Sequence, residues 1–95
     1  SYGGMVITGV ADRLPGRVAR LVYLDAVLPE DGESLASLRG GAEAFAPLVR
    51  DGLVVPNWVP PGKPHPIDVP HPLRTFTDRL ALRDPARAAI PGAYL

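Results

Sequence analysis

The chain has 95 residues, 46% of them hydrophobic, and ten Lys plus Arg balance ten Asp plus Glu for a formal net charge of zero. A balanced charge gives no electrostatic reason to expect nucleic acid or an anionic membrane surface as a partner. The chain has no cysteine, which excludes a disulfide framework and a thiolate metal site. No stretch approaches the roughly 18 apolar residues of a membrane span. We therefore expect a globular protein without a membrane partner and with a cytoplasmic location.

The first expected element is a helix over residues 3–14. Its apolar residues recur at helical spacing and fall mostly on one face: Met5, Val6, Val10 and Leu14. Asp12 and Arg13 then lie on the wetter side. The Pro-Gly pair at residues 15–16 ends the helix, because proline disfavours a helical preceding residue and glycine turns the chain. Residues 21–26 (LVYLDA) follow as an apolar run typical of a strand buried on both faces of a parallel sheet.

The later part of the chain is rich in proline. Most of the twelve prolines lie beyond residue 46, and they argue against regular core elements there. We expect, in order, a short helix over residues 33–38, another over 42–46 and 48–50 that is interrupted or begun at Pro47, an extended segment over 54–72, a helix over 75–82 with Phe76, Leu80 and Leu82 inward, a turn or short helix over 84–89, and a strand over 90–95. A strand, a helix and a strand in succession is the repeat of an α/β fold, and here its first strand would precede residue 1.

The chain begins with Ser1-Tyr2-Gly3-Gly4, in which S-x-G is the second half of a nucleophile elbow. The complete motif, G-x-S-x-G, holds a serine on a sharp turn between a strand and a helix. Small residues beside the serine let the helix pass close to the strand, and the helix N-terminus directs backbone N–H groups toward a developing oxyanion. We therefore interpret Ser1 as a nucleophile and the Tyr2 N–H as half of an oxyanion hole.

Three segments of the chain resemble the α/β-hydrolase superfamily: residues 1–7 (SYGGMVI), 20–26 (RLVYLDA) and 28–32 (LPEDG). Within that superfamily, the chain is similar to the esterase branch that includes plant methylesterases, hydroxynitrile lyases and their bacterial relatives. Residues 71–77 (HPLRTFT) match more loosely. The resemblance implies the fold class α/β, with this chain an internal fragment of an α/β-hydrolase fold that starts at the nucleophile serine.

The resemblance also divides the chain into three parts. Residues 1–27 would belong to the hydrolase core, residues 28–88 would form a cap inserted over the active site, and residues 89–95 would return to the core as a strand. A cap shapes the substrate pocket and keeps water off it. Apolar cap residues are therefore candidates for the walls of that pocket, the aromatic ones as substrate-binding residues: Trp58, Phe45 and Phe76, with Leu48, Val54 and Val55 beside them.

The activity that the resemblance implies is hydrolysis of a small, uncharged ester through an acyl-enzyme on Ser1, without a cofactor or a metal. In this superfamily the triad acid and then the histidine follow the serine, on later loops. We expect both beyond residue 95. Asp25 is the internal candidate for the acid, and otherwise its side chain should hydrogen-bond loop backbone. His65 and His71 would break the order, so we expect them to be surface or packed residues that, with Asp68 between them, form no metal site.

Three alternatives remain open. A hydroxynitrile lyase would need cap residues in roles that this sequence does not assign, and Lys63 in its proline-rich stretch is expected to face water. An N-terminal nucleophile hydrolase would use the α-amine of Ser1 as base, but such folds begin with a strand, whereas Gly3-Gly4 leads into a helical pattern. Finally, the separate 95-residue polypeptide could be inactive, because a single strand pair buries too little surface for independent folding.

Overall fold

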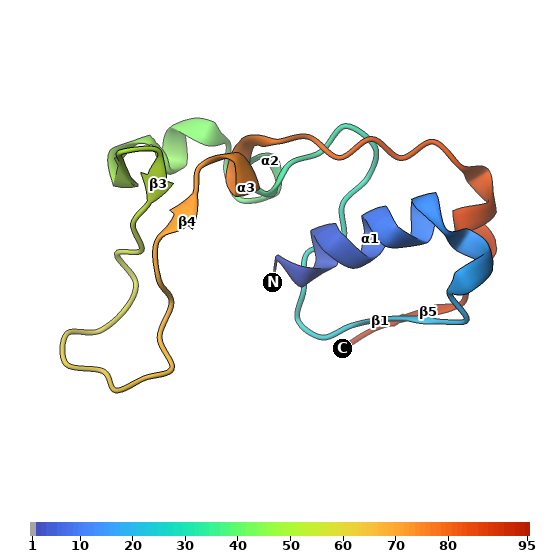
Figure 1. The fold of residues 1–95 in the computed structure, drawn as a ribbon, viewed down its shortest axis with the longest axis horizontal. Helices are drawn as coiled ribbons and strands as arrows, with labels where there is room; N and C mark the ends of the chain where they lie inside the picture. The colour runs from blue at the N-terminus through green and yellow to red at the C-terminus, as the bar shows by residue number, and fades with distance from the viewer. Residues whose placement is uncertain (1) are drawn as a thin grey trace.

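The computed structural model describes residues 2–95 and shows two lobes that are joined along one side (Figure 1). The larger lobe holds the helix α1 (Gly3–Arg13) and two strands, β1 (Leu21–Tyr23) and β5 (Gly92–Tyr94). The smaller lobe holds short helices and strands, and a long loop hangs from it. The Cα radius of gyration is 15.1 Å, above the roughly 13 Å of a compact domain of about 100 residues. The chain is therefore more extended than a compact domain of its length.

The helix α1 forms where the sequence predicts it, but its buried face differs from the predicted one. The 3-10 turn η1 (Pro15–Arg17) follows it, as the Pro-Gly signal indicates. Asp12 is buried at 6% exposure, and the exposed apolar residues of α1 and its end are Val6, Val10 and Leu14. The prediction that Asp12 lies on the wetter side is wrong, because the backbone N–H groups of Arg83 and Asp84 bind its carboxylate inside the fold.

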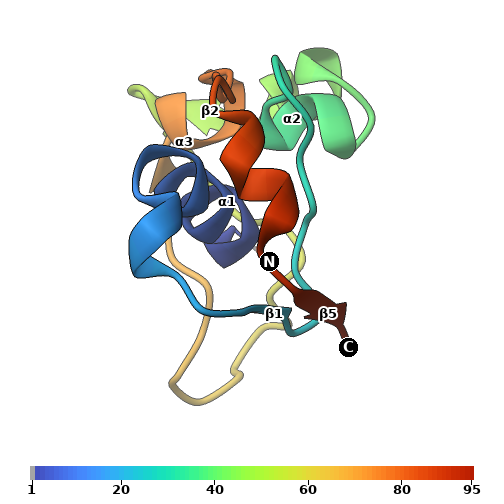
Figure 2. The ribbon, with the colours of Figure 1, turned by 90° about the vertical axis from the view of Figure 1, so that its right-hand side faces the viewer.

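The strands β1 and β5 lie side by side and parallel, with Tyr23 in register with Tyr94. The two tyrosine rings stack with 6.4 Å between their centroids. This pairing confirms the predicted strand over residues 90–95, whose regular part is Gly92–Tyr94. Figure 2 shows the strand pair below α1, with the 3-10 helix η4 (Pro85–Ala89) alongside α1. The helix and the strand pair thus form the two layers of an α/β unit.

The segment after β1 crosses the first turn of α1. The predicted strand over residues 21–26 stops at Tyr23, and Asp25 then turns the backbone with a positive φ of 45°. Two residues later the backbone of Val27 touches Gly4. A Cβ atom on Gly4 would lie 1.8 Å from the Val27 carbonyl oxygen. Only glycine allows the helix and the crossing segment to come this close.

The smaller lobe is built around the helices α2 (Leu35–Leu38) and α3 (Arg74–Thr77). The helix α2 begins with a capping box, in which the hydroxyl groups of Ser34 and Ser37 each accept a backbone N–H from the other residue. A cluster of buried side chains extends from these helices to the start of α1: Met5, Val27, Leu35, Ala36, Val54 and Phe76. One hydrophobic core therefore joins the two lobes.

The predicted helix over residues 75–82 is wrong in its second half, because the helix ends with α3. Beyond it, Leu80 pairs with the segment that precedes α2. The Gly32 N–H donates to the Leu80 carbonyl oxygen and the Leu80 N–H donates to the Glu33 carbonyl oxygen, both at 2.8 Å. This pairing replaces helical hydrogen bonds. The side chains that were expected to point inward are buried or half-buried: Phe76, Leu82 and Leu80.

The prediction that residues 48–50 are helical is wrong for Val49 and Arg50, because these two residues enter a hairpin. The strand β2 (Val49–Arg50) pairs antiparallel with β3 (Leu53–Val54). Between them, Asp51 and Gly52 have φ values of 53° and 77°, the two successive positive values of a type I′ hairpin turn. The Asp-Gly pair is the sequence signal for this turn.

The remaining elements are short. Residues 54–72 are mostly extended, as predicted, and return to β3 through the antiparallel strand β4 (His71–Pro72). We call the connection between them the 55–70 loop. The expected helix over residues 42–46 is two 3-10 turns, η2 (Ala42–Ala44) and η3 (Ala46–Leu48). Within residues 2–95, no helix is both long enough and apolar enough to cross a membrane.

Candidate functional site

The start of α1 is where the sequence predicts the catalytic serine, although Ser1 itself lies outside the described residues. Tyr2 is the N-cap residue of α1, with φ −64° and ψ −26°, and its carbonyl oxygen accepts the Met5 N–H at 2.9 Å. The first N–H groups of any helix lack partners within the helix and carry the positive end of its dipole. The position of Tyr2 suits an oxyanion donor, and that role stays a prediction.

A buried chain of hydroxyl groups ties the first turn of α1 to the sheet. The Thr8 hydroxyl donates to the Gly4 carbonyl oxygen at 2.6 Å and lies 2.6 Å from the Tyr23 hydroxyl. Because the single Thr8 proton goes to Gly4, the Tyr23 hydroxyl must donate to Thr8. This contact links β1 to the turn of α1 that follows Tyr2.

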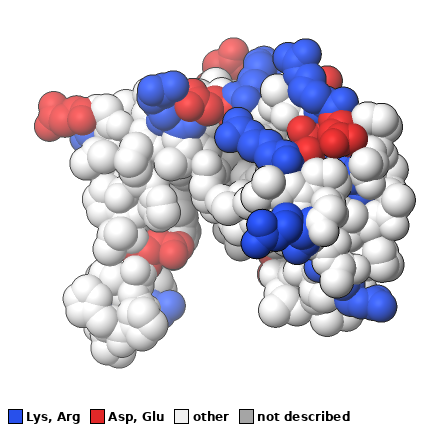
Figure 3. All heavy atoms as spheres, turned by 45° about the vertical axis from the view of Figure 1, so that its right-hand side comes forward, with Lys and Arg blue, Asp and Glu red and all other residues white. Residues whose placement is uncertain are grey.

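One cavity of about 480 Å³ brings together the three aromatic residues that the sequence predicts as substrate contacts. It is lined by Asp25, Leu35, Arg39, Phe45, Trp58, Asp68 and Phe76. These residues come from the end of β1, from both ends of α2, from the junction of η2 and η3, from the 55–70 loop and from α3. Figure 3 shows the lobe that carries the 55–70 loop standing apart from the larger lobe, with a notch between them. The substrate-binding role of the three aromatic residues stays a prediction.

Two pair contacts hold the walls of this cavity. The rings of Phe45 and Phe76 meet edge to face, with 4.7 Å between centroids and an interplanar angle of 61°. Across from them, the Trp58 indole N–H donates to Asp68 Oδ2 at 2.5 Å and joins the two limbs of the 55–70 loop. The cavity thus has one fixed aromatic wall and one wall held by an indole–carboxylate hydrogen bond.

Asp25 lies at the edge of the cavity in the left-handed conformation. Its backbone N–H donates to the Leu95 carbonyl oxygen at 2.6 Å and extends the pairing of β1 with β5. Among residues 2–95, the Asp25 carboxylate makes no hydrogen bond to loop backbone, so that expectation is wrong. The reason is that the tight turn is held by the main chain, which leaves the carboxylate exposed beside the cavity.

The two histidines lie on the smaller lobe. His65 is exposed in the 55–70 loop and His71 is exposed on β4, as expected. Lys63 is exposed in the same loop. Over the part of the chain that the structure describes, no group of three or more His, Cys, Asp or Glu side chains is arranged to hold a metal ion.

No family model matches this chain, and no solved structure matches it. Over 38 residues, the chain is 66% identical to a carbendazim hydrolyzing esterase from Nocardioides sp. (strain SG-4G). The chain is similar to an esterase. This match covers 40% of the chain and 16% of the relative's length, so it relates one segment, and not a whole enzyme, to that activity.

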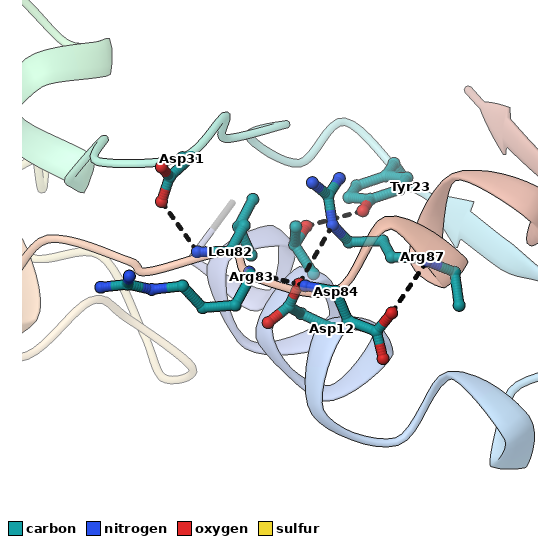
Figure 4. A network of polar contacts seen from close by, with 9 residues as sticks. Asp12, Tyr23, Asp31, Leu82, Arg83, Asp84 and Arg87 are labelled. Carbon is teal, nitrogen blue, oxygen red and sulfur yellow. Dashed lines mark hydrogen bonds and ion pairs between the residues drawn. The ribbon is translucent and has the colours of Figure 1, made fainter.

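A polar network that the sequence does not predict fixes residues 83–87 against α1 (Figure 4). Asp12 Oδ1 accepts the N–H groups of Arg83 at 2.8 Å and Asp84 at 2.9 Å, and the Arg87 Nε lies 3.4 Å from it. The Arg83 N–H, then the Asp84 N–H, and to a lesser extent Arg87, lower the pKa of Asp12 below 3.8 against the opposing effect of burial. The network holds the residues at the start of η4 against α1.

The sequence alone does not place Asp68 or Arg39 at a substrate cavity. Asp68 and Arg39 line it, but neither lies in a motif, and each reaches the cavity only through the fold of the 55–70 loop or the end of α2. The sequence offers one signal for this contact, which is residue type. The proline-rich loop contains a carboxylate, Asp68, and an indole donor, Trp58, and these two side chains form a hydrogen bond.

Proposed function

We propose that this chain supplies the nucleophile and the cap of a serine esterase of the α/β-hydrolase type. The observation that carries this proposal is the geometry after the S-x-G motif, where α1 begins at Gly3 and Gly4 touches the backbone of Val27. An elbow places its serine at the N-terminal end of a helix, and the close contact at Gly4, the residue after the motif glycine Gly3, packs the first turn of that helix tightly against the neighbouring chain. The similarity of one segment to an esterase supports the same reaction.

In the proposed reaction, the Ser1 hydroxyl attacks the ester carbonyl carbon while a histidine takes its proton. The negative charge that forms on the carbonyl oxygen is met by the Tyr2 N–H at the start of α1, with the second donor from another loop. The alcohol leaves with the proton from the histidine. Water, activated by the same histidine, then attacks the acyl-enzyme and releases the acid and Ser1.

The three parts of the chain have separate roles in this proposal. Residues 1–27 carry the nucleophile and its helix, residues 28–88 cover the site, and residues 89–95 return to the sheet beside β1. The acid and the histidine come from segments of the protein outside residues 1–95. We therefore expect the separate polypeptide of residues 1–95 to have no esterase activity.

Carbendazim is the first substrate to test, because the similar relative is described as hydrolysing it. In the complete expressed protein, Ser1→Ala should lower kcat for carbendazim and for 4-nitrophenyl acetate by at least about 10³-fold, as expected for loss of a serine nucleophile. Ser37→Ala, which removes a serine from the smaller lobe, is the control and should retain turnover. Undiminished hydrolysis by the Ser1 variant would contradict the proposal.

An N-terminal nucleophile hydrolase is less consistent with the structure. Such an enzyme places its nucleophile at the start of a strand, whereas α1 begins at Gly3. Acetylation of the Ser1 α-amine separates the two mechanisms, because it would abolish activity only where that amine is the base.

A further inference from the structure

We propose that the cavity lined by Asp25, Arg39, Phe45, Trp58, Asp68 and Phe76 binds a planar aromatic group that carries N–H donors and is neutral or positively charged. This inference deepens the proposed function, since the cavity would receive the part of the substrate that does not react. It also defines a binding site that can be tested without turnover.

The size of the cavity fits such a group. Its volume of about 480 Å³ lies within the roughly 300 to 1,000 Å³ of small-molecule sites. The site is concave, and its residues come from both lobes. A ligand there would touch residues that are distant in the sequence, so it would also hold the 55–70 loop against the larger lobe.

The aromatic walls favour a flat ring. Phe76 is 8% exposed and is anchored in the core, and its edge-to-face contact fixes Phe45 beside it. Trp58, in contrast, is 50% exposed and presents its ring from the 55–70 loop. Aromatic rings attract other rings in offset-stacked or edge-to-face arrangements. A planar ligand can therefore pack against Phe45 and Trp58 together, while a puckered ring cannot lie flat on either.

The charged groups favour N–H donors over acceptors on that ring. Two carboxylates, Asp25 and Asp68, and one guanidinium, Arg39, line the cavity, so its formal charge is negative. Asp68 Oδ2 accepts a hydrogen bond from the Trp58 indole N–H, and this bond fixes the orientation of the carboxylate. Ionised carboxylates accept hydrogen bonds and cannot donate them. A ligand with N–H groups at its edge can donate to Asp25 and Asp68, whereas an anionic ligand is repelled by them.

The experiment uses Trp58 as its reporter, because its side chain lines the cavity and the Trp58→Phe variant separates its signal from that of every other tryptophan in the complete protein. Benzamidine, a planar ring with amidinium donors, is titrated into the complete expressed protein while tryptophan fluorescence is recorded. We expect a saturable change that Trp58→Phe removes. Two probes of similar size serve as comparisons: benzoate has the ring with the opposite charge, and cyclohexanecarboxamidine has the donors without a planar ring. Each should bind at least about tenfold more weakly, the effect of losing one such interaction.

Carboxylate variants test the polar half of the site. Asp25→Asn and Asp68→Asn should each weaken benzamidine binding by about tenfold or more. The matched control is Asp51→Asn, because Asp51 has a positive φ of 53° like the 45° of Asp25 but lies in the hairpin turn. It should bind benzamidine as the parent protein does.

Two results would overturn the inference: benzoate binding as tightly as benzamidine, or both cavity variants binding as tightly as the Asp51 control. Neither result bears on the nucleophile, which the Ser1→Ala kinetics test separately. Conversely, if Ser1→Ala keeps full activity while benzamidine binds as described, the hydrolase proposal fails and the binding site stands.

Discussion

Gly4 and Val27 meet backbone to backbone, at a distance that leaves no room for a side chain on residue 4. A Cβ atom there would lie 1.8 Å from the Val27 carbonyl oxygen, 2.8 Å from its carbonyl carbon and 3.0 Å from its nitrogen. These are main-chain atoms, which cannot rotate away. The contact joins the first turn of α1 to the segment that leaves β1, and it therefore positions the start of the helix that the proposed reaction uses.

Gly4→Ala should destabilise the protein strongly. The added methyl group has to displace either α1 or the Val27 backbone, and overpacking of this kind costs about 1 to 3 kcal/mol. Gly3→Ala is the matched control, because a Cβ atom on Gly3 meets nothing within 4 Å, and alanine favours helix by up to about 1 kcal/mol. Urea unfolding of the two variants measures the difference. Equal free energies of unfolding would show that the close contact does not exist.

The hydroxyl chain from Tyr23 to Gly4 gives a second prediction. Tyr23→Phe removes the donor to Thr8 and should lower the free energy of unfolding by about 1 kcal/mol. Thr8→Val should cost more, because it leaves the buried Tyr23 hydroxyl without its partner. Tyr94→Phe is the control: its ring stacks on Tyr23, its hydroxyl makes no hydrogen bond within residues 2–95, and the change should be below about 0.5 kcal/mol. Additive effects of the Thr8 and Tyr23 changes in a double-mutant cycle would exclude the bond.

Asp12 should make the stability of the protein depend on pH in acid. Its pKa in the folded state is below the ordinary 3.8 because the N–H groups of Arg83 and Asp84 and the nearby Arg87 favour the carboxylate. At a pH between the folded-state and unfolded-state pKa values of Asp12, the unfolded protein binds more protons than the folded protein. The stabilisation of the fold by ionised Asp12 is therefore complete above about pH 4 and is lost as the pH falls through the folded-state pKa.

Unfolding of the parent protein and of Asp12→Asn between about pH 2 and pH 7 measures this contribution. The variant should be less stable near neutrality, and its curve should be flatter in acid. Asp78→Asn, which removes an exposed carboxylate paired with Arg74 at 3.2 Å, should follow the parent curve. Parallel curves for the parent and the Asp12 variant would show that the network does not hold the carboxylate ionised.

The local elements of this fold could be predicted because short segments encode them. The Pro15-Gly16 pair, which follows an apolar run, ends α1, and the hydroxyl groups of Ser34 and Ser37 cap the start of α2. The turn at Asp51-Gly52 also has a local signal, the Asp-Gly pair itself, but the sequence preceding it predicts a helix that the structure does not have at Val49 and Arg50.

Contacts between distant segments could not be predicted. Asp12 is buried because its partners at residues 83 and 84 arrive from the other end of the chain, and hydropathy alone assigns a carboxylate to water. Likewise, the helix that starts at Arg74 ends early because Leu80 pairs with Glu33. Residue type alone predicts a place in the substrate pocket for Phe45, Trp58 and Phe76. That they line one cavity together with Asp25 and Asp68 depends on the path of the 55–70 loop.

The central claim is that Ser1 is the nucleophile of an esterase, and active-site labelling tests it most directly. The complete expressed protein is treated with a fluorophosphonate probe, and the labelled peptide is identified by mass spectrometry. We expect one adduct, on Ser1, that forms whether or not the α-amine of that residue is free. Labelling of another residue, or labelling of Ser1 only when its α-amine is free, would show that Ser1 is not the nucleophile of an α/β-hydrolase esterase.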